Sequence, residues 1–341
     1  MSPVDNSQYM KGIKEHLQRM QEHDRKSKIA EQKNRDELDG LVALVNSIFE
    51  KHKVSGRITK EHIRFNAEHA GHVVHVEDKA LSHIIFDHYF PQPARKSYYH
   101  FTDLSAFKSI ISNRKLRLSN LHKRFADGEF TTFYDEHGMD GYRKGGNVLG
   151  IDTGQDAIMS EIYFLSLTGS GFSFDGDRLW HTFGHGGKGV RLEFSVVPKT
   201  RDFREVYYSP THARGPIPLL QDLLHKVKEC YGIPLTFTYA SKIGAFYIKG
   251  QFQNEDEFRF LVKRTADDYY AMHLVPVVTD ESKHIAYIEL DFDNDFAQFD
   301  LISIQPGFNC SVDDVAGIRT VMEESGLGAS VLPKAPELGY I

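Results

Sequence analysis

The stretch SYYHFTDLSAFKSIISNRKLRLSN, residues 97–120, contains the elements that decide the fold class. Its aromatic start predicts a strand over Tyr98–Thr102, and the apolar residues of Asp103–Asn113 recur at helical spacing. Asp103 is a suitable N-cap, because a short carboxylate side chain can accept a hydrogen bond from the first turn of a helix. Leu116–Ser119 is predicted to be a second strand. A helix between two short strands favours an α+β domain.

The same alternation of short β-type runs and helices continues toward the C-terminus. The Gly- and Asp-rich segments 131–160 and 169–186 are typical of long surface loops. The remaining elements are predicted strands at 162–168, 189–197, 243–248, 258–263, 286–292 and 301–306, and predicted helices at 217–231 and 312–325. We therefore expect one α+β domain over residues 96–341.

Residues 1–95 are expected to form a helical region in front of this domain. Residues 8–50 are predicted to be helical, mostly charged in the first half and amphipathic from Leu38 to Phe49. Residues 51–90 are predicted to be a second helical stretch, and the Pro-containing linker PQPAR (91–95) marks the boundary. The charged segment is either a solvated helix that docks by one narrow stripe or a partner-binding, self-associating segment.

Composition excludes several classes of protein. The chain has 341 residues and a formal net charge of −6, which argues against a globally basic nucleic-acid-binding protein but leaves room for a local basic patch. No apolar run approaches the roughly 20 residues of a membrane span, so no membrane association is expected. The first residues lack a signal-peptide pattern, and two cysteines cannot form a disulfide framework. We expect a cytoplasmic protein.

Several motifs with a known chemistry fail on inspection. GHGGKG (184–189) lacks the Ser or Thr that follows the lysine of a Walker loop, and DFDND (291–295) lacks the glycine and glutamate of a calcium loop. The chain has 18 histidines, but neither HTFGH (181–185) nor the four histidines within 62–75 have the spacing of a zinc site. No nucleophile elbow G-x-S-x-G occurs. We predict no metal site and no serine hydrolase.

Three segments, taken in order, resemble a bacterial domain family of unknown function, DUF2971. They are residues 97–120, YFLSLT (163–168) with LWHTFGHGGKGVRLEF (179–194), and YIKGQFQNEDEFRF (247–260). The resemblance covers about 98–335, most of the chain beyond the helical region.

The chain departs from that family at a few positions. Phe101 and Phe183 stand where the family usually has Tyr, and DGE (127–129) stands where it tends to carry Asn-Asp and a later Glu.

This family in turn resembles the ADP-ribosyltransferase superfamily, whose fold is a small split β-sheet with a cleft for NAD. The resemblance implies that NAD is the co-substrate, that Glu257 is the catalytic carboxylate, and that Glu255 and His100 assist it. It also implies NAD-binding roles for His100, Phe101, Thr102, Ser119, Tyr163, Ser166, Trp180 and Arg259.

The chemistry of such a site is consistent with these residue types. Cleavage of the nicotinamide–ribose bond gives a cationic, oxocarbenium-like sugar, which a carboxylate stabilises. A neutral histidine can bind ribose hydroxyls without adding positive charge. On an extended strand, Glu255 and Glu257 would point to the same face, so that one could act on the sugar and the other on the acceptor. Arg259 could bind an NAD phosphate or hold Glu257 ionised.

Three functions remain open at this stage. The first is an NAD-dependent mono-ADP-ribosyltransferase, a bacterial or phage-related toxin or defence effector that modifies a protein or nucleic-acid acceptor and binds an antitoxin or other partner through its N-terminal helices. The second is an inactive protein of the same fold that binds a nucleotide or a partner protein. The third is a metal-dependent phosphoesterase, which would need clustered carboxylates and histidines. Taken singly, His100 could be a core histidine and Glu255–Glu257 a solvated acidic turn.

Overall fold

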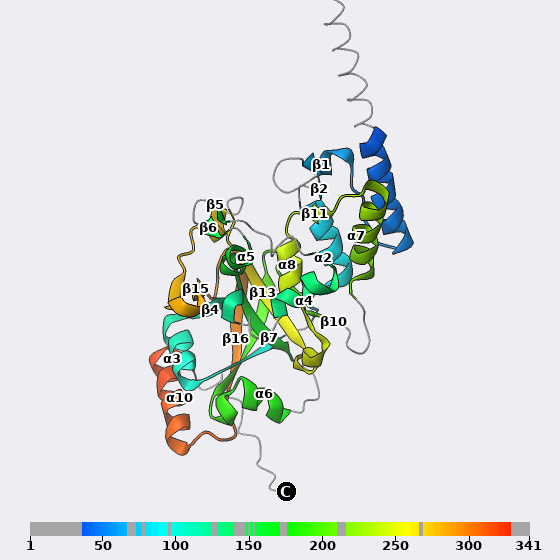
Figure 1. Cartoon of the computed structure of the whole chain (residues 1–341). Coiled ribbons are helices and arrows are strands. Elements are labelled where there is room, and N and C mark those ends of the chain that lie inside the picture. Colours follow the sequence, from blue (N-terminus) through cyan, green and yellow to red (C-terminus); the bar gives the residue numbers. More distant parts are fainter. Residues whose placement is uncertain are drawn as a thin grey trace, which may run out of the picture. The chain divides into compact units, whose positions relative to one another are not determined.

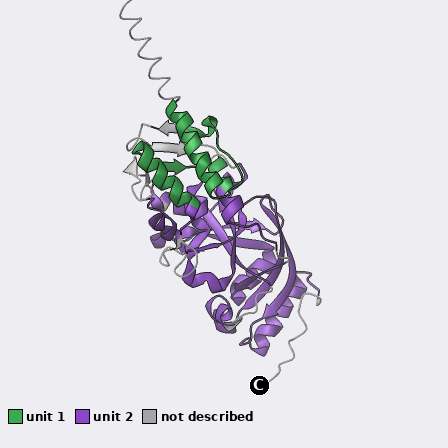
Figure 2. Ribbon diagram, turned by 90° about the vertical axis from the view of Figure 1, so that its right-hand side faces the viewer, with its two compact units in different colours: residues 1–84, 219–238 green, residues 85–218, 239–341 purple. Residues whose placement is uncertain are grey.

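The computed structural model describes residues 36–66, 73–76, 79–94, 97–123, 129–139, 147–148, 151–152, 154–170, 176–209, 216–265 and 269–328 (Figure 1). The fold is of the α+β class. The chain divides into two compact units, one made of residues 1–84 and 219–238 and the other of residues 85–218 and 239–341 (Figure 2). The sequence predicts a single boundary at PQPAR, whereas these units alternate along the chain.

The first unit combines two helices with a small sheet. A helix over residues 36–51 buries Leu41, Val45, Ile48 and Phe49, which confirms the amphipathic helix predicted at 38–49. The second helix, α7 (Pro218–Tyr231), buries its own apolar stripe. The sheet is formed by β1 (Ile63–Asn66), β2 (Val73–Val76) and β11 (Leu235–Phe237), with a short helix η1 (Lys60–His62) before it.

The predicted helical stretch over 51–90 is therefore wrong for residues 63–66 and 73–76, which are strands. β1 pairs antiparallel with β2, and β2 pairs in parallel with β11, which lies far along the chain. Because β2 pairs with a strand that is distant in the sequence, the residues around β2 give little indication that it is a strand. The predicted helix over residues 8–35 lies outside the described residues.

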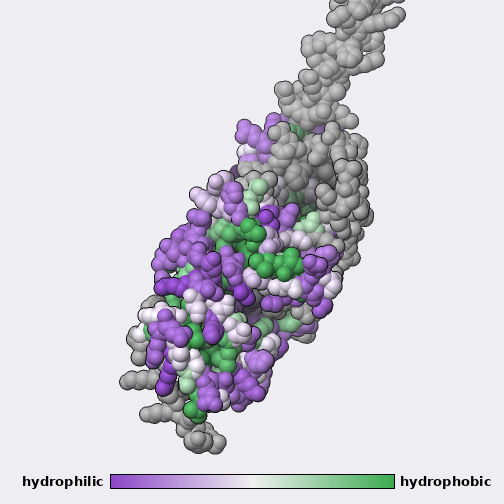
Figure 3. Space-filling view, turned by 90° about the vertical axis from the view of Figure 1, so that its left-hand side faces the viewer, coloured by the Kyte–Doolittle hydropathy of each residue, from purple (hydrophilic) through white to green (hydrophobic). Residues whose placement is uncertain are grey.

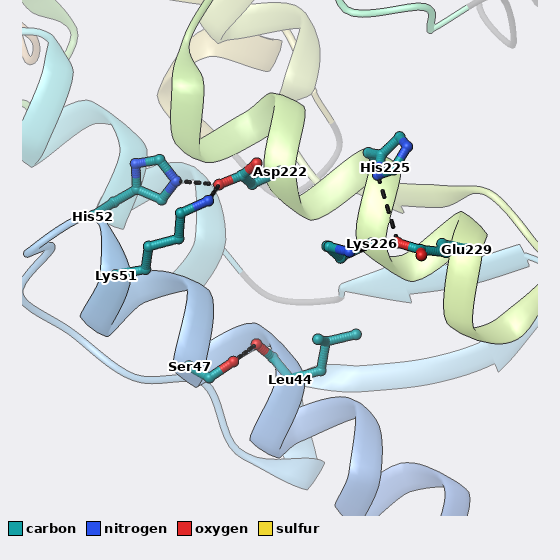
Figure 4. Close-up of polar contacts among 8 residues, drawn as sticks. All are labelled: Leu44, Ser47, Lys51, His52, Asp222, His225, Lys226 and Glu229. Carbon is teal, nitrogen blue, oxygen red and sulfur yellow. Dashed lines mark hydrogen bonds and ion pairs between the residues drawn. The ribbon is translucent and has the colours of Figure 1, made fainter.

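The Asp222 carboxylate links the two helices of this unit. Figure 4 shows Lys51 and His52 pointing toward Asp222 on α7. The Lys51 Nζ and His52 Nε2 atoms lie 2.5 and 2.6 Å from Asp222 Oδ2. Hydrogen bonds from Lys51 and then His52 lower the pKa of the Asp222 carboxyl. Because the group is partly exposed, these contacts orient the helices more than they stabilise them.

The second unit is built on a nine-stranded sheet in which every pairing is antiparallel. Its main path runs β14-β15-β4-β7-β3-β8-β16, and β13 joins β7 to β9. The strands are β3 (Tyr98–Thr102), β4 (Lys115–Asn120), β7 (Ile162–Gly169), β8 (Val190–Pro198), β9 (Phe203–Glu205), β13 (Glu257–Lys263), β14 (Val277–Asp280), β15 (Ile285–Asp291) and β16 (Ala297–Pro306). Two short pairs lie apart from it, β5 (Asn147–Val148) with β6 (Ile151–Asp152) and β10 (Tyr207–Ser209) with β12 (Tyr247–Lys249).

The two edges of β7 are used differently. β13 pairs with β7 along its whole length. On the other edge, β4 pairs with residues 163–164 and β3 pairs with residues 168–169. Residues 165–167 therefore have no described strand beside them on this edge. β3 and β4 separate at this point, which opens the sheet between them.

Helices pack on this sheet and at its ends. α3 (Leu104–Asn113) begins at the predicted cap, where Asp103 Oδ1 accepts a hydrogen bond from the Ala106 N–H at 2.8 Å. α3 packs against α10 (Val312–Glu324), and both segments are helical as predicted. The other helices are α2 (Ala80–Tyr89), α4 (Glu129–Glu136), α5 (Gln155–Glu161), α6 (Gly176–Thr182), α8 (Ala240–Ala245) and α9 (Tyr269–Met272), with the short turns η4 (His185–Gly187), η5 (Gly250–Glu255) and η6 (Glu281–Lys283).

Three local predictions are wrong. The predicted loop at 131–160 contains most of α4 and nearly all of α5, the predicted loop at 169–186 contains α6, and the predicted strand at 243–248 is the end of α8 followed by β12. These helices have only six to eight residues, too few for a helical period to stand out from the surrounding sequence.

The GHGGKG segment is a packing loop. A Cβ atom on Gly189 would lie 2.1 Å from the Thr102 carbonyl oxygen, and one on Gly307 would lie 2.2 Å from that of Gly187. The backbones also bond directly, because the Gly307 N–H donates to the Gly189 oxygen at 2.9 Å. The glycines are thus needed for the close approach of two chain segments. They do not indicate a phosphate-binding loop.

We expect Gly189→Ala to lower the free energy of unfolding by about 2–3 kcal/mol, because the backbone must move away from the added methyl group. Gly317→Ala is the matched control, since its Cβ would meet nothing within 4 Å and alanine favours helix α10. Urea unfolding measures both. Equal stability of the two variants would contradict the close-packing argument.

Candidate functional site

A cavity of about 710 Å³ opens where β3 and β4 separate. It is lined by residues of β3, β4, β7 and β15, by α3, and by the start of β13. Seven of the residues singled out in the sequence line it: His100, Phe101, Thr102, Ser119, Ser166, Glu255 and Glu257. The topology thus brings segments from three distant parts of the chain to one concave surface.

Ser166 occupies the middle of β7, where none of the described strands lies beside this edge. Its carbonyl oxygen lies 3.3 Å from His100 Nδ1, and its hydroxyl donates a short hydrogen bond to Glu257 Oε1. Ser166 therefore contacts His100 through its backbone and Glu257 through its side chain. One residue connects the two groups that the resemblance marks as functional.

His100 is held as a neutral ring. A carbonyl oxygen can only accept, so Nδ1 carries the proton in this hydrogen bond and Nε2 is left as an acceptor. Burial lowers the pKa of His100 from 6.5 to about 4, the Ser166 carbonyl opposes this shift, and the charge of Lys123 adds to it. At neutral pH the ring therefore presents a neutral acceptor to a ligand.

Glu257 is the most restrained carboxylate of the cavity. Only 2 % of the residue is exposed. The Arg259 Nε atom lies 2.8 Å from Glu257 Oε1, and Arg259 Nη2 lies 3.2 Å from Oε2. The Glu257 N–H donates to the Tyr208 hydroxyl at 2.7 Å, and burial together with the Glu257 charge raises the pKa of Tyr208. The carboxylate is thus fixed in place, and its negative charge is balanced.

Glu255 lines the same cavity, but by a different geometry from the one predicted. It ends the short helix η5, and Asp256 then adopts a left-handed conformation with φ of 45° before β13 begins at Glu257. The prediction that Glu255 and Glu257 lie on one extended strand is therefore wrong. A tight turn at Asp256, and not the two-residue period of a strand, brings both carboxylates to the cavity.

Three of the predicted NAD-binding residues do not line the cavity. Arg259 is 1 % exposed, bonds to the Ala245 carbonyl at 2.6 Å and pairs with Glu257, so it fits the role of holding Glu257 and not that of binding a phosphate. Tyr163 is buried on β7, where burial raises the pKa of its hydroxyl against the opposing charge of Arg264. Trp180 packs edge-on against Phe101 with ring centroids 5.0 Å apart, and so supports the cavity wall from behind.

Three further lining residues, two cationic and one aromatic, were not identified from the sequence. They are Arg117, Lys123 and Tyr287. The Arg117 guanidinium lies 4.6 Å from the Tyr287 ring centroid and bonds to Glu289 at 3.0 Å. The alternation in Lys115–Ser119 could have revealed Arg117, since its polar residues share one face of β4. Tyr287 had no such signal, because it comes from a distant strand.

Within the part of the chain that the structure describes, no group of three or more His, Cys, Asp or Glu side chains gathers as a metal site would require. In the same part, no helix is both long and apolar enough to cross a membrane. Most of the histidines of residues 62–75 have side chains outside the described set, although His62 Nδ1 accepts a bond from the Thr59 N–H at 2.9 Å.

Comparison with known proteins gives no relative: no family model, curated protein or solved structure matches this chain. The arrangement of the cavity residues is therefore the basis for a functional conclusion.

We expect His100 to stay neutral well below the usual range of histidine, because its pKa is lowered to about 4. Between pH 6.5 and 4 the unfolded chain would bind a proton that the folded chain does not, so the contribution of His100 to stability is full above pH 6.5 and is lost as the pH falls toward 4. NMR titration of the histidine ring protons, assigned with His100→Gln, measures this. A midpoint near 6.5 would contradict the neutral ring.

Proposed function

We propose that this chain is an NAD-dependent mono-ADP-ribosyltransferase that acts as a bacterial or phage-related toxin or defence effector. One observation carries the proposal: Ser166 links His100 and Glu257 by hydrogen bonds on the wall of one cavity. These are three of the positions to which the resemblance gives a role, and they come from strands far apart in the sequence. The cavity volume of about 710 Å³ also falls within the range of ligand pockets.

In this proposal the bond between nicotinamide and ribose breaks, and nicotinamide leaves with the bonding electron pair. The positive charge left on the sugar is stabilised by the Glu257 carboxylate, which Ser166 and Arg259 hold in position. Because these groups are ordered before the reaction, little reorganisation is needed as the charge develops. His100 Nε2 accepts a hydrogen bond from a ribose hydroxyl.

The acceptor then attacks the sugar carbon. Glu255 orients the acceptor group or takes its proton, since it lines the same cavity and belongs to another element than Glu257. The acceptor is a protein or a nucleic acid, and the N-terminal residues bind an antitoxin or another partner.

A second candidate function is an inactive protein of the same fold that binds a nucleotide or a partner protein. It is favoured by the burial of Glu257, which is bonded to Arg259 and Ser166 in the way of a structural carboxylate. This candidate predicts that NAD binds to the cavity without release of nicotinamide.

We expect the full chain to release nicotinamide from labelled NAD, alone or with an added cell lysate. Glu257→Gln should lower this rate roughly 100-fold or more, because it removes the charge that stabilises the sugar cation. Glu324→Gln, an exposed glutamate on α10, is the matched control and should keep the wild-type rate. Absence of release by the wild type, or an unchanged rate in Glu257→Gln, would refute the enzyme proposal.

Ser166→Ala is expected to lower the rate about tenfold, because a hydrogen bond to a charged group contributes about 1.5–3 kcal/mol. Binding of NAD, followed by calorimetry, should change less than the rate. Ser303→Ala is the matched control, since Ser303 also donates from a strand to a carboxylate, the half-buried Glu193, at 2.7 Å, and it does not line the cavity. If both serine variants lose activity equally, Ser166 has only a structural role.

A further inference from the structure

Exposed hydrophobic residues concentrate in one short segment of the second unit. Figure 3 shows hydrophobic patches that interrupt a largely hydrophilic surface on one face of the molecule. Among the described residues, ten large hydrophobic side chains are strongly exposed, and six of them lie within residues 269–278. They are Tyr269, Tyr270, Met272, Val275, Val277 and Val278, and we call them the 269–278 patch. Concentrated apolar exposure of this kind marks an interaction surface.

The patch includes an open sheet edge. β14 is the first strand of the nine-stranded sheet and pairs only with β15 among the described strands. Val277 and Val278 point to opposite faces of the strand, yet they are 45 % and 56 % exposed. Edge strands are usually protected by charges, because their free N–H and C=O groups attract other strands. Residues 277–279 are Val-Val-Thr and carry no charge, and the register of the pairing with β15 shifts between Val278 and Asp280.

β14 also leads to the proposed active site. Thr279 of β14 lines the cavity, as do Ile285, Ala286 and Tyr287 of β15. Neighbouring strands lie about 4.8 Å apart, so a strand paired with β14 would run one strand spacing from a cavity-lining residue. Such a strand could place one of its side chains at the opening of the cavity.

The charges beside β14 indicate what kind of partner fits. Asp280 ends the strand, accepts hydrogen bonds from the Ser282 hydroxyl and the Lys283 N–H, and lies 3.5 Å from Lys283 Nζ. The exposed Glu281 follows it. These carboxylates disfavour a nucleic acid at this edge, and Glu281 favours a basic residue in the partner. Apolar residues of the partner would meet Val277 and Val278, and main-chain hydrogen bonds would supply the pairing.

We propose that β14 binds an extended segment of a protein acceptor by strand addition, with alternating apolar side chains over Val277 and Val278 and a basic residue beside Glu281. This inference rests on the proposed function, because it identifies the acceptor as a protein and places it at the rim of the same cavity.

Peptide binding to the full chain tests the docking step without NAD. The probe is a fluorescein-labelled peptide of alternating valine and threonine with a lysine at each end, and fluorescence anisotropy measures its binding. We expect saturable binding that weakens about tenfold in Val278→Lys and about tenfold when alternate backbone nitrogens of the peptide are methylated. Val197→Lys is the matched control, because Val197 is 52 % exposed on another strand, β8.

Thermal unfolding confirms that both lysine variants are folded, and hydrogen exchange should show slower exchange of the amides of 277–279 when the peptide is bound. Equal binding of the methylated peptide, or equal binding by Val278→Lys and the wild type, would overturn the proposal. So would a dimer of the wild type that Val278→Lys dissociates, since a second copy would then occupy the edge. Transfer of labelled ADP-ribose to nucleic acid and not to protein would also overturn it.

The two readouts distinguish failure of the docking proposal from failure of the enzyme proposal. Nicotinamide release in the absence of an acceptor should be the same in Val278→Lys and the wild type, because Val278 does not line the cavity. Peptide binding without any nicotinamide release would refute the enzyme and leave the docking edge, whereas release without peptide binding would refute the docking edge alone.

Discussion

The site depends on the hydrogen-bonding demand of one strand edge. Over residues 165–167, β7 has β13 on one side and no described strand on the other, where β3 and β4 separate. A carbonyl that is partly withdrawn from water and has no partner is costly, and the half-buried Ser166 obtains a partner for its carbonyl from His100. The same contact that completes the backbone hydrogen bonding also sets the ring orientation of His100 and leaves Nε2 as its acceptor. The hydrogen bond between His100 and the Ser166 carbonyl therefore contributes both to the fold and to the proposed chemistry.

Local features of the fold could be predicted from the sequence, and distant ones could not. The strand at 98–102 and the helix that Asp103 caps are encoded by spacing within ten residues, and both are found as predicted. The convergence of His100, Ser166 and Glu257 was implied only by the order of motifs, and its geometry depends on how β3, β7 and β13 pair. The alternative of an acidic turn at Glu255–Glu257 is right about the turn at Asp256 and wrong about its exposure, because both glutamates are buried.

The Glu257–Arg259 pair shows why a buried charge complicates the interpretation of substitutions. Both residues are almost completely buried, and loss of one partner leaves the other charge without compensation, which typically costs about 3–5 kcal/mol. An Arg259 variant would therefore affect folding and the carboxylate together. Ser166 offers a better separation of the two effects, since its hydroxyl contacts the carboxylate without carrying charge.

The order in which the chain is synthesised has a consequence for the first compact unit. Its sheet needs β11, and its core needs the apolar face of α7, yet both lie beyond residue 217. Residues 36–76 therefore leave the ribosome before their partners have been synthesised. The edge of β2 that pairs with β11 stays unpaired while more than a hundred further residues of the other unit are made. For the same reason, cleavage at PQPAR would leave the N-terminal fragment without α7 and β11. The C-terminal fragment would then carry the leucines of α7 exposed to solvent.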